Sequence, residues 1–312
     1  MTGDFDGALK LHWSHLNICK QLNDNAGIGR AYGNIGNAYS ALKQFEEAIK
    51  YHKLELQISK EVHDRGAEAS THGNLAIAYQ AIGLYDQALT HFNLHLSVAT
   101  EMKDSTSEAN ALCNLGNYHS FRKDFDKALH YYEQYIESTK TIGDKESEAK
   151  AYHLVGFAHF SMKKHEQALQ YFELDMNLSK EIQDRSSIGR AYCHLGLVKA
   201  AIGKLEEALE CQKHFLCTAQ GDNTNKLKAM GNVAEILTLQ GKYSEAMRML
   251  EKQLITARSL GDVTSEAKVF AAFGSCQKAA GNFEEAARYY KQELIFRQGA
   301  QDIIAEIVSL GK

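Results

Sequence analysis

The sequence predicts an all-α protein in which one pair of helices is repeated along the chain. The 312 residues include no proline, which favours helices joined by short turns over a β fold, because proline interrupts helices and is common in turns and linkers. Hydrophobic residues make up 44% and charged residues 24% of the chain, the usual composition of a globular protein. The strongest observation is an internal repeat of about 40 residues, the period of a helical-repeat array.

Three residue types mark this repeat independently. An alanine recurs at Ala8, Ala48, Ala88, Ala128, Ala168, Ala208, Ala246 and Ala286. An aspartate recurs at Asp24, Asp64, Asp104, Asp144, Asp184, Asp222, Asp262 and Asp302. A small residue recurs at Gly36, Ala76, Gly116, Gly156, Gly196, Ala234 and Gly274. The one shortened interval lies between Ala208 and Asp222, which predicts a short second helix with a local offset in that repeat.

Each repeat is predicted to contain two helices. The first begins at the aspartate, whose carboxylate accepts hydrogen bonds from unpaired backbone N–H groups of the first turn. Tyr32, Ile35, Gly36 and Tyr39 then lie on one helical face. A turn follows, with glycine at positions 83, 203, 241 and 281, and the second helix begins at positions 5, 45, 85, 125, 165, 205, 243 and 283. The small residues at positions 36 and 48 predict a close approach of the two helices.

The repeat boundaries predict one array over residues 1–312. It consists of a partial repeat at 1–23, repeats that start near 24, 64, 104, 144, 184, 222 and 262, and the start of a further helix at 302–312. Both ends fall inside a repeat, and a free-standing array needs polar caps at its ends. We therefore expect the chain to be a segment of a longer protein.

The pattern resembles the tetratricopeptide repeat. The sequence Asn-Ile-Gly-Asn-Ala-Tyr at 34–39, the loop glycine, the aromatic residue, the Glu-Ala pair at 47–48 and Tyr51 match its signature positions in order. The longer period and the Gly-Asp junctions at 143–144, 221–222 and 261–262 are similar to the LGN/Pins subgroup, and more similar still to a large many-repeat member of the family. The resemblance implies a right-handed superhelical solenoid of helix-turn-helix repeats. It also implies a cytoplasmic adaptor in cell polarity and spindle orientation, with cytoskeletal or cortical association left open.

A second face of each first helix carries the candidate binding residues. Its outer positions are basic in five of seven repeats, its next positions are small, and its middle carries aromatic and aliphatic residues. The resulting candidate site comprises Arg30, Asn37, Asn110, Asn117, Lys150, His153, Phe157, Phe160, Arg190, Leu197, Lys228 and Lys268. We read this face as a groove with an open floor and a basic edge.

This groove is expected to bind a peptide segment of a partner protein that carries acidic and apolar residues. Basic side chains steer and align acids, and buried aromatic residues supply affinity. Alternatively, the basic row pairs with neighbouring Glu or Asp, and Phe157 and Phe160 are buried between repeats. Asn34, Asn74, Asn114 and Asn232 are interpreted as structural, whereas Asn37 and Asn117 are interpreted as ligand contacts.

Catalytic chemistry is not indicated. The sequence contains no phosphate-binding loop, no HExxH and no GxSxG motif. His91 and His95 have metal-capable spacing but no third ligand. We therefore expect no enzyme activity, no cofactor and no metal. The six cysteines form no CxxC pair and are expected to be reduced thiols.

Composition favours proteins as the partners of this chain. A net charge of −4 and a pI near 6.4 do not favour nucleic acid or anionic membranes, and no apolar run is long enough for a membrane span. The sequence thus predicts a scaffold that captures a partner segment. A regulatory array of a larger enzyme, for example one with a caspase-like domain, and an architectural spacer are the alternatives. The oligomeric state is left open.

Overall fold

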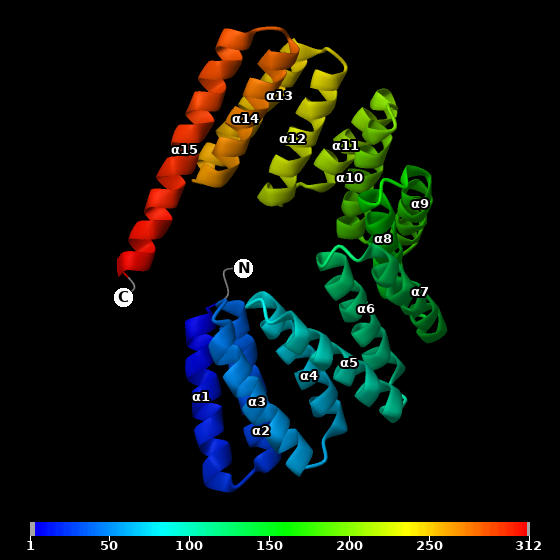
Figure 1. Ribbon diagram of the computed structural model, residues 1–312, viewed down its shortest axis with the longest axis vertical. Coiled ribbons are helices and arrows are strands. Elements are labelled where there is room, and N and C mark those ends of the chain that lie inside the picture. Colours follow the sequence, from blue (N-terminus) through cyan, green and yellow to red (C-terminus); the bar gives the residue numbers. More distant parts are fainter. Residues whose placement is uncertain (1–3, 311–312) are drawn as a thin grey trace. The chain divides into compact units, whose positions relative to one another are not determined.

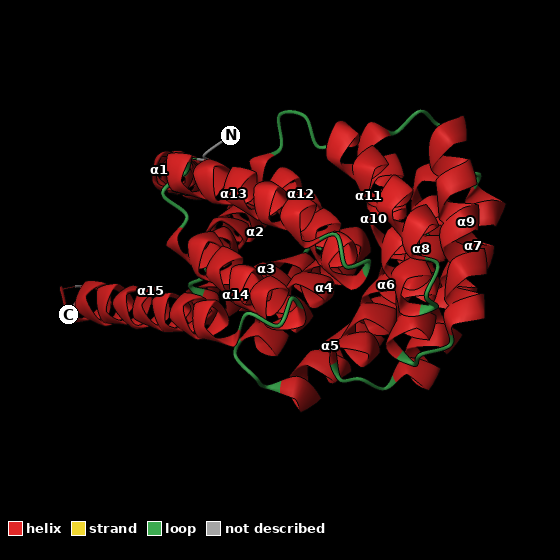
Figure 2. Cartoon of the chain, turned by 90° about the horizontal axis from the view of Figure 1, so that it is seen from above, coloured by secondary structure: helices red, strands yellow, loops and turns green. Residues whose placement is uncertain are grey.

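The computed structural model describes the backbone of residues 4–310 and the side chains of residues 4–299. The regular structure of this part of the chain is entirely helical (Figures 1 and 2), which confirms the all-α prediction. In order, the helices are Phe5–Leu22 (α1), Asn25–Ala41 (α2), Phe45–Glu61 (α3), Arg65–Ala81 (α4), Tyr85–Met102 (α5), Ser105–Phe121 (α6), Phe125–Ile142 (α7), Lys145–Ser161 (α8), His165–Glu181 (α9), Arg185–Ala201 (α10), Leu205–Thr218 (α11), Asn223–Leu239 (α12), Tyr243–Ser259 (α13), Val263–Ala279 (α14) and Phe283–Leu310 (α15).

The repeated aspartates start the first helices, as predicted. The Asp24 carboxylate accepts a hydrogen bond from the backbone N–H of Gly27 at 2.9 Å, so it satisfies one of the unpaired N–H groups at the helix start. Equivalent caps are formed by Asp64, Asp104, Asp144, Asp184, Asp222 and Asp262. Each repeated aspartate therefore fixes the residue at which a first helix begins.

The turns inside the repeats need a left-handed backbone conformation. Gly83 and Gly203 adopt φ angles of +83° and +82°, which glycine reaches without the steric cost that other residues incur. Lys43 occupies the same place in its own repeat with φ of +60°. Non-glycine residues therefore also form this turn.

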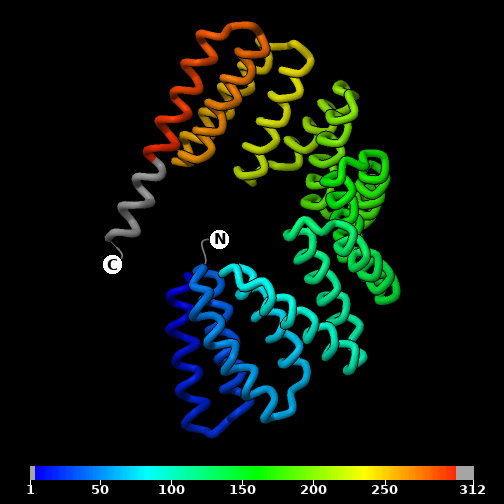
Figure 3. Tube along the Cα trace, in the orientation of Figure 1, coloured from blue at the N-terminus to red at the C-terminus, as the bar shows by residue number. Residues whose placement is uncertain are grey.

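The helices form two compact units, residues 1–151 and 152–312. Within each unit consecutive helices run antiparallel (Figure 3). In the first unit α2 packs on α3, α4 on α5 and α6 on α7, around a core that includes Leu75, Phe92 and Leu115. In the second unit α10 packs on α11, α12 on α13 and α14 on α15, and Leu250 and Phe273 belong to its core. Helix α8 contributes residues to both units.

The small residues at the repeat position of Gly36 lie where the two helices of a repeat meet, as predicted. A Cβ atom built on Gly36 would lie 2.6 Å from the His52 ring, and one on Gly156 would lie 2.8 Å from the Phe172 ring. Real side chains do not approach this closely, so a larger residue would force the helices apart. The ring of the second helix fills the space that the missing side chain leaves.

The variant Gly116→Ala is expected to destabilise the fold by roughly 1–3 kcal/mol, because its Cβ atom would overpack a filled core. The ideal Cβ position is 2.4 Å from Cε1 of the Tyr132 ring, and Tyr132 is buried. The matched control is Gly66→Ala, an exposed helical site where the nearest atom is 3.6 Å away. There alanine should stabilise by about 0.5–1 kcal/mol. Urea unfolding followed by circular dichroism measures both, and equal midpoints for the two variants would contradict the close-contact argument.

Two boundaries differ from a strictly regular repeat. Helix α11 has 14 residues, whereas α9 and α13 have 17, which confirms the predicted short second helix. The further helix expected to start at 302 is not separate, because α15 is continuous from Phe283 to Leu310. A helix that continues keeps its backbone N–H groups paired with carbonyls four residues earlier, so an aspartate alone does not end it. Residues 311–312 of this expectation lie outside the described residues.

Candidate peptide-binding surface

All twelve predicted site residues lie on the first helices of their repeats. Eight have exposed side chains, namely Arg30, Asn37, Asn110, Asn117, Lys150, Phe157, Lys228 and Lys268. Four are half-buried, namely His153, Phe160, Arg190 and Leu197. Residues 30–150 belong to the first unit and residues 153–268 to the second. The predicted residues therefore form two sets, each described within its own unit.

In the first unit the predicted polar side chains differ in how strongly other groups of the protein hold them. Arg30 lies 3.7 Å from Asp24, and both side chains are well exposed, so this pair is hydrated and weak. The amide of Asn117 is held internally, because its Oδ1 accepts from the Tyr132 hydroxyl at 2.9 Å and its Nδ2 donates to Cys113 Sγ at 3.6 Å. The structure therefore gives Asn117 an internal role in the repeat, and its contact with a ligand stays a prediction.

In the first unit the row of small residues is not an open floor, which corrects the expectation from the sequence for this part of the chain. A Cβ atom on Gly33 would lie 2.2 Å from Glu55 Oε1, and one on Gly73 would lie 3.0 Å from the His95 ring. Side chains of the second helices therefore fill the space under this row. These small residues leave room for side chains of the second helix, which would have to move if the residue were larger.

A buried carboxylate organises the neighbouring part of the second unit. Asp175 on α9 is fully buried, and its Oδ1 accepts from Arg190 Nη2 at 3.2 Å and from Ser179 Oγ at 3.1 Å. Its Oδ2 lies 3.2 Å from His153 Nδ1. Burying a carboxylate is costly unless it is paired and hydrogen-bonded. Arg190 is therefore the main counter-charge of Asp175, although 32% of the Arg190 side chain remains exposed.

The two histidines beside this pair are held neutral. Burial lowers the pKa of His153, although the nearby Asp175 carboxylate opposes the shift. Burial, together with the nearby charge of His153, lowers the pKa of His194 to about 4. His194 Nδ1 donates to the backbone carbonyl of Arg190 at 3.0 Å, and its ring stacks on Phe172 with centroids 5.2 Å apart.

The apolar residues of the predicted site separate into exposed and packed ones. Phe157 is 42% exposed and meets the His194 ring edge-on at 6.4 Å between centroids. Phe160 packs against the core around Phe172, and Leu197 packs against Cys193 and Phe215. The structure thus answers the question left open by the sequence: Phe157 is available to a ligand, whereas Phe160 serves the core.

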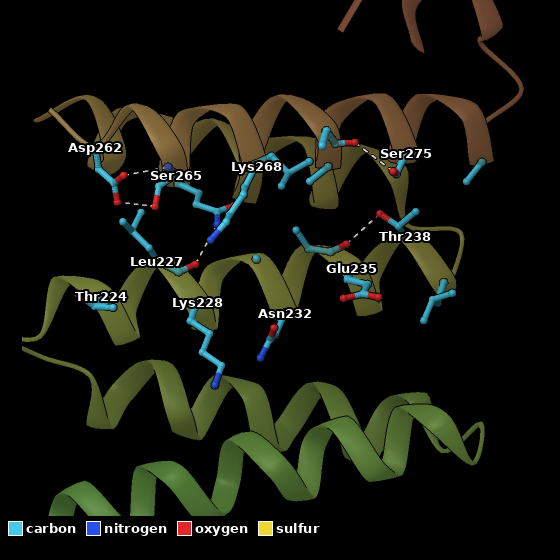
Figure 4. A pocket seen from close by; sticks show the side chains of 18 residues that line it. Thr224, Leu227, Lys228, Asn232, Glu235, Thr238, Asp262, Ser265, Lys268 and Ser275 are labelled. Atoms are coloured by element: carbon cyan, nitrogen blue, oxygen red, sulfur yellow. Dashed lines mark hydrogen bonds between the residues drawn. The ribbon is translucent and has the colours of Figure 1, made fainter. Parts of the chain in front are cut away.

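A cavity of about 840 Å³ lies between α12 and α14. Figure 4 shows these two first helices side by side with their side chains around it. Its lining includes Lys228, Gly231, Glu235, Thr238, Lys268, Ala271 and Ser275, all from the face predicted to bind. Asn232, predicted to be structural, also lines it and donates to Gln212 Oε1 at 3.0 Å.

Three further features of the described residues concern metal ions, cysteines and membranes. No cluster of three or more His, Cys, Asp or Glu side chains suited to a metal ion is found among them. His91 contacts His72, with the two Nδ1 atoms 2.8 Å apart, and does not join His95 in a shared site. Each of the six cysteines is unpaired, and Cys217 alone among them is exposed. None of the described helices is both long and apolar enough to cross a bilayer.

The side chains that the second helices place under this face were not predicted from the sequence. They occupy one repeat position, at Glu55, His95, Tyr135, Asp175, Phe215 and Gln253. Five of the six are buried and Glu55 is half-buried. Their common spacing is the signal that could have revealed them. Their chemistry differs from repeat to repeat, so the spacing alone does not indicate what each one contacts.

This architecture defines the class as a repeat protein built from helical hairpins. The tetratricopeptide repeat family matches residues 67–141, 147–216 and 225–294, and again residues 29–54. These segments make up well over half of the chain, so the chain belongs to the tetratricopeptide repeat family. No curated protein matches it significantly.

Solved structures show the same fold at low sequence identity. The apo form of the quorum sensor NprR from B. thuringiensis is 18% identical with a TM-score of 0.69, and the match covers 94% of this chain and 83% of that one. A Rap protein complexed with competence and sporulation factor is 17% identical with a TM-score of 0.61, over 88% of this chain and 76% of that one.

A third similar structure belongs to a larger protein. A signal transduction ATPase with a tetratricopeptide repeat sensor, from Pyrococcus horikoshii, is 15% identical with a TM-score of 0.74. The match covers 89% of this chain but only 44% of that protein. This chain therefore spans less than half of the ATPase, and the likeness concerns the fold of the repeats.

Proposed function

We propose that the chain is a protein-interaction scaffold that reversibly captures a segment of a partner protein on the exposed face of its first helices. The observation that carries this proposal is the cavity between α12 and α14, which is lined by residues of that face. A pocket lined largely by apolar groups with a few polar ones is the usual form of a binding site. No covalent step is involved.

The partner segment should contain both acidic and apolar residues. Lys150, Lys228 and Lys268 are exposed and sit on a chain of net charge −4, so they form local positive sites that attract acids. Phe157 offers an exposed aromatic ring, the type of side chain that contributes most to binding when a partner covers it. Within the second unit, the charges of Lys228 and Lys268 and the ring of Phe157 would then act on the same partner segment.

The similar structures support a protein or peptide as the ligand. One of them is a Rap protein in complex with competence and sporulation factor, and another is a quorum sensor. The 40-residue period and the Gly-Asp junctions support a place in the LGN/Pins-like subgroup. We accordingly assign the chain the role of a cytoplasmic adaptor in cell polarity or division.

A second candidate function is a sensor array within a larger signalling enzyme. The similarity to the repeat sensor of a signal transduction ATPase favours it. In that case the same face binds the signal, and catalysis resides in another domain. The sequence of the gene that follows Lys312 tests this candidate, because a nucleotide-binding or protease domain there would support it.

The structure changes the choice of variants for the binding test. Arg190 pairs with buried Asp175, so reversing its charge would disturb the fold as well as the surface. We therefore choose Lys150→Glu/Lys228→Glu/Lys268→Glu, three exposed first-helix lysines. The matched control is Lys213→Glu/Lys252→Glu/Lys291→Glu, three exposed lysines of second helices.

The measurement is quantitative mass spectrometry of proteins that the wild type and the two variants retain from cell lysate. We expect the first-helix variant to lose partners that the control retains, and the retained segments to be acidic. Loss should be greater at low salt, since screening weakens attraction between exposed charges. Identical retention by all three proteins would refute binding through this face.

A further inference from the structure

The cavity between α12 and α14 has charges of opposite sign at its two ends. Lys228 and Lys268 occupy equivalent positions in the N-terminal halves of the two helices, and Glu235 lies toward the C-terminal end of α12 (Figure 4). Asp262 also lines the lysine end, but its carboxylate is engaged as a helix cap by Ser265, at 2.9 Å from the backbone N–H and 2.5 Å from the hydroxyl.

The three charged groups at the rim are available to a ligand. Lys228, Lys268 and Glu235 are exposed and form no ion pair within 4 Å among the described residues, although the Lys228 ammonium lies near the Cys193 thiol and Lys268 lies near the Asp262 carboxylate. In contrast, the hydroxyls of Thr238 and Ser275 donate to the helix carbonyls of Ala234 and Ala271 at 2.8 Å and 3.0 Å. The charges are therefore the main polar features left for recognition.

The lining between the two charged ends is mostly apolar, and its two amides, Asn232 and Gln253, already donate to Gln212 Oε1 and to the Leu227 carbonyl. The apolar part is made of small and aliphatic side chains. It includes Leu227, Ala234, Leu239, Leu250, Ala271 and Ala272. Leu250 reaches it from α13 and is 1% exposed, so the base of the cavity is continuous with the core. A ligand that lies along α12 thus passes from a positive end, over an apolar base, to a negative end.

The separation of the charges sets a spacing for the ligand. Lys228 and Glu235 are seven positions apart on α12, which corresponds to about 10 Å at a rise of 1.5 Å per residue. An extended chain advances about 3.3 Å per residue, and only its alternate side chains share a face. Side chains at i, i+2 and i+4 can therefore face the cavity over about 13 Å, which the long side chains of Lys228 and Glu235 can reach. A neutral or uniformly acidic segment would leave Glu235 without a counter-charge.

We propose that this cavity selects an extended peptide segment in which an acidic and a basic residue are four positions apart, with an apolar residue midway between them. The inference rests on the proposed function and names the chemistry of the segment. The acid pairs with Lys228 and Lys268, the base pairs with Glu235, and the intervening apolar side chain covers Leu250. Either chain direction satisfies this arrangement, because both ends are defined by side-chain charge.

The test is selection of a displayed library of random dodecapeptides on the 312-residue chain. The variants are Glu235→Lys and Lys228→Glu/Lys268→Glu, and Lys252→Glu, on the exposed surface of α13, is the matched control. Wild type and control should enrich acid and base at a spacing of four. Glu235→Lys should enrich two acids at that spacing, and the double lysine variant should enrich two bases.

Affinity then provides a second measurement. For a synthetic peptide selected on the wild type, fluorescence anisotropy should give about tenfold weaker binding to each cavity variant, and the charge-swapped peptide should recover it. A tenfold change corresponds to about 1.4 kcal/mol. The altered side chains are exposed, so circular dichroism should show an unchanged helical fold.

The outcomes separate the two proposals. If peptides are enriched but their charge spacing is the same on every variant, the cavity is not the selecting site. If the enriched peptides instead no longer bind to the Phe157→Ser variant, binding to the face is supported and the cavity proposal is refuted. If no variant and no wild-type selection enriches any peptide, both proposals fall.

Discussion

Replacing Arg190 by alanine is expected to destabilise the second unit by about 3–5 kcal/mol, because it leaves a buried charge without its partner. Asp175 has no exposed surface, and Arg190 Nη2 donates to its Oδ1 at 3.2 Å. The remaining neighbour, His153, is a poor replacement cation because burial lowers its pKa. The free energy of unfolding in urea, followed by circular dichroism, measures the effect.

The repeat provides a matched control for this prediction. Arg30 occupies the same repeat position, but it lies 3.7 Å from an exposed Asp24, with 66% of its own side chain exposed. Arg30→Ala should therefore change stability by less than about 1 kcal/mol. Comparing the two separates the effect of a buried partner from that of losing an arginine at this position.

A double variant tests the cause of the loss. Arg190→Ala/Asp175→Asn removes the unpaired charge while it keeps a similar side-chain volume at position 175. It should be more stable than Arg190→Ala alone, because the cost of the single variant comes mainly from the abandoned carboxylate. A double variant less stable than both single variants would show that packing, not charge, is the main effect of Arg190.

Acidification from pH 6.5 to 4 is expected to destabilise the first unit through its buried histidines. His72 is 3% exposed, and burial together with the nearby charge of His91 lowers the pKa of His72 to about 4. Burial also lowers the pKa of His91. In the folded unit their Nδ1 atoms are 2.8 Å apart, so one ring must donate and the other accept. Protonating both rings would bring two donors together.

The sign of the effect follows from proton binding. Between pH 6.5 and 4 the unfolded chain binds protons at position 72 that the folded chain does not, so stability falls as the pH falls through this window. The shift in the pKa of His72 corresponds to about 3 kcal/mol once the pH reaches 4. Above pH 6.5 both states are neutral at this residue, and its contribution is constant.

The first repeat suggests the matched variant for the acid effect. Tyr32 and Tyr51 occupy there the positions that His72 and His91 hold in the next repeat, and they stack with centroids 6.2 Å apart. His72→Tyr/His91→Tyr should fold with the same packing and lose less stability between pH 6.5 and 4. Unfolding free energies at several pH values measure this. An unchanged slope would assign the acid sensitivity to other groups.

Several features of the site were predictable from residue spacing. The first helices carry the predicted face, and Lys228 and Lys268 line one cavity because residues one period apart occupy equivalent places on parallel helices. The cavity itself was not predictable. It depends on how far α12 and α14 separate and on the small size of Ala271 and Ala272, which spacing alone does not determine.

The sequence by itself determined the helices, their caps and their pairing, because these depend on local interactions repeated many times. Asp24 caps its helix with a residue three positions away, and Gly36 admits the His52 ring of the paired helix. The tertiary structure alone decided which surface residues are free. Arg30 and Arg190 are the same residue at the same repeat position, yet only Arg190 meets a buried carboxylate. That difference arises because the packing of α9 on α10 places the buried Asp175 carboxylate beside Arg190. The spacing of residues in the sequence does not predict this contact.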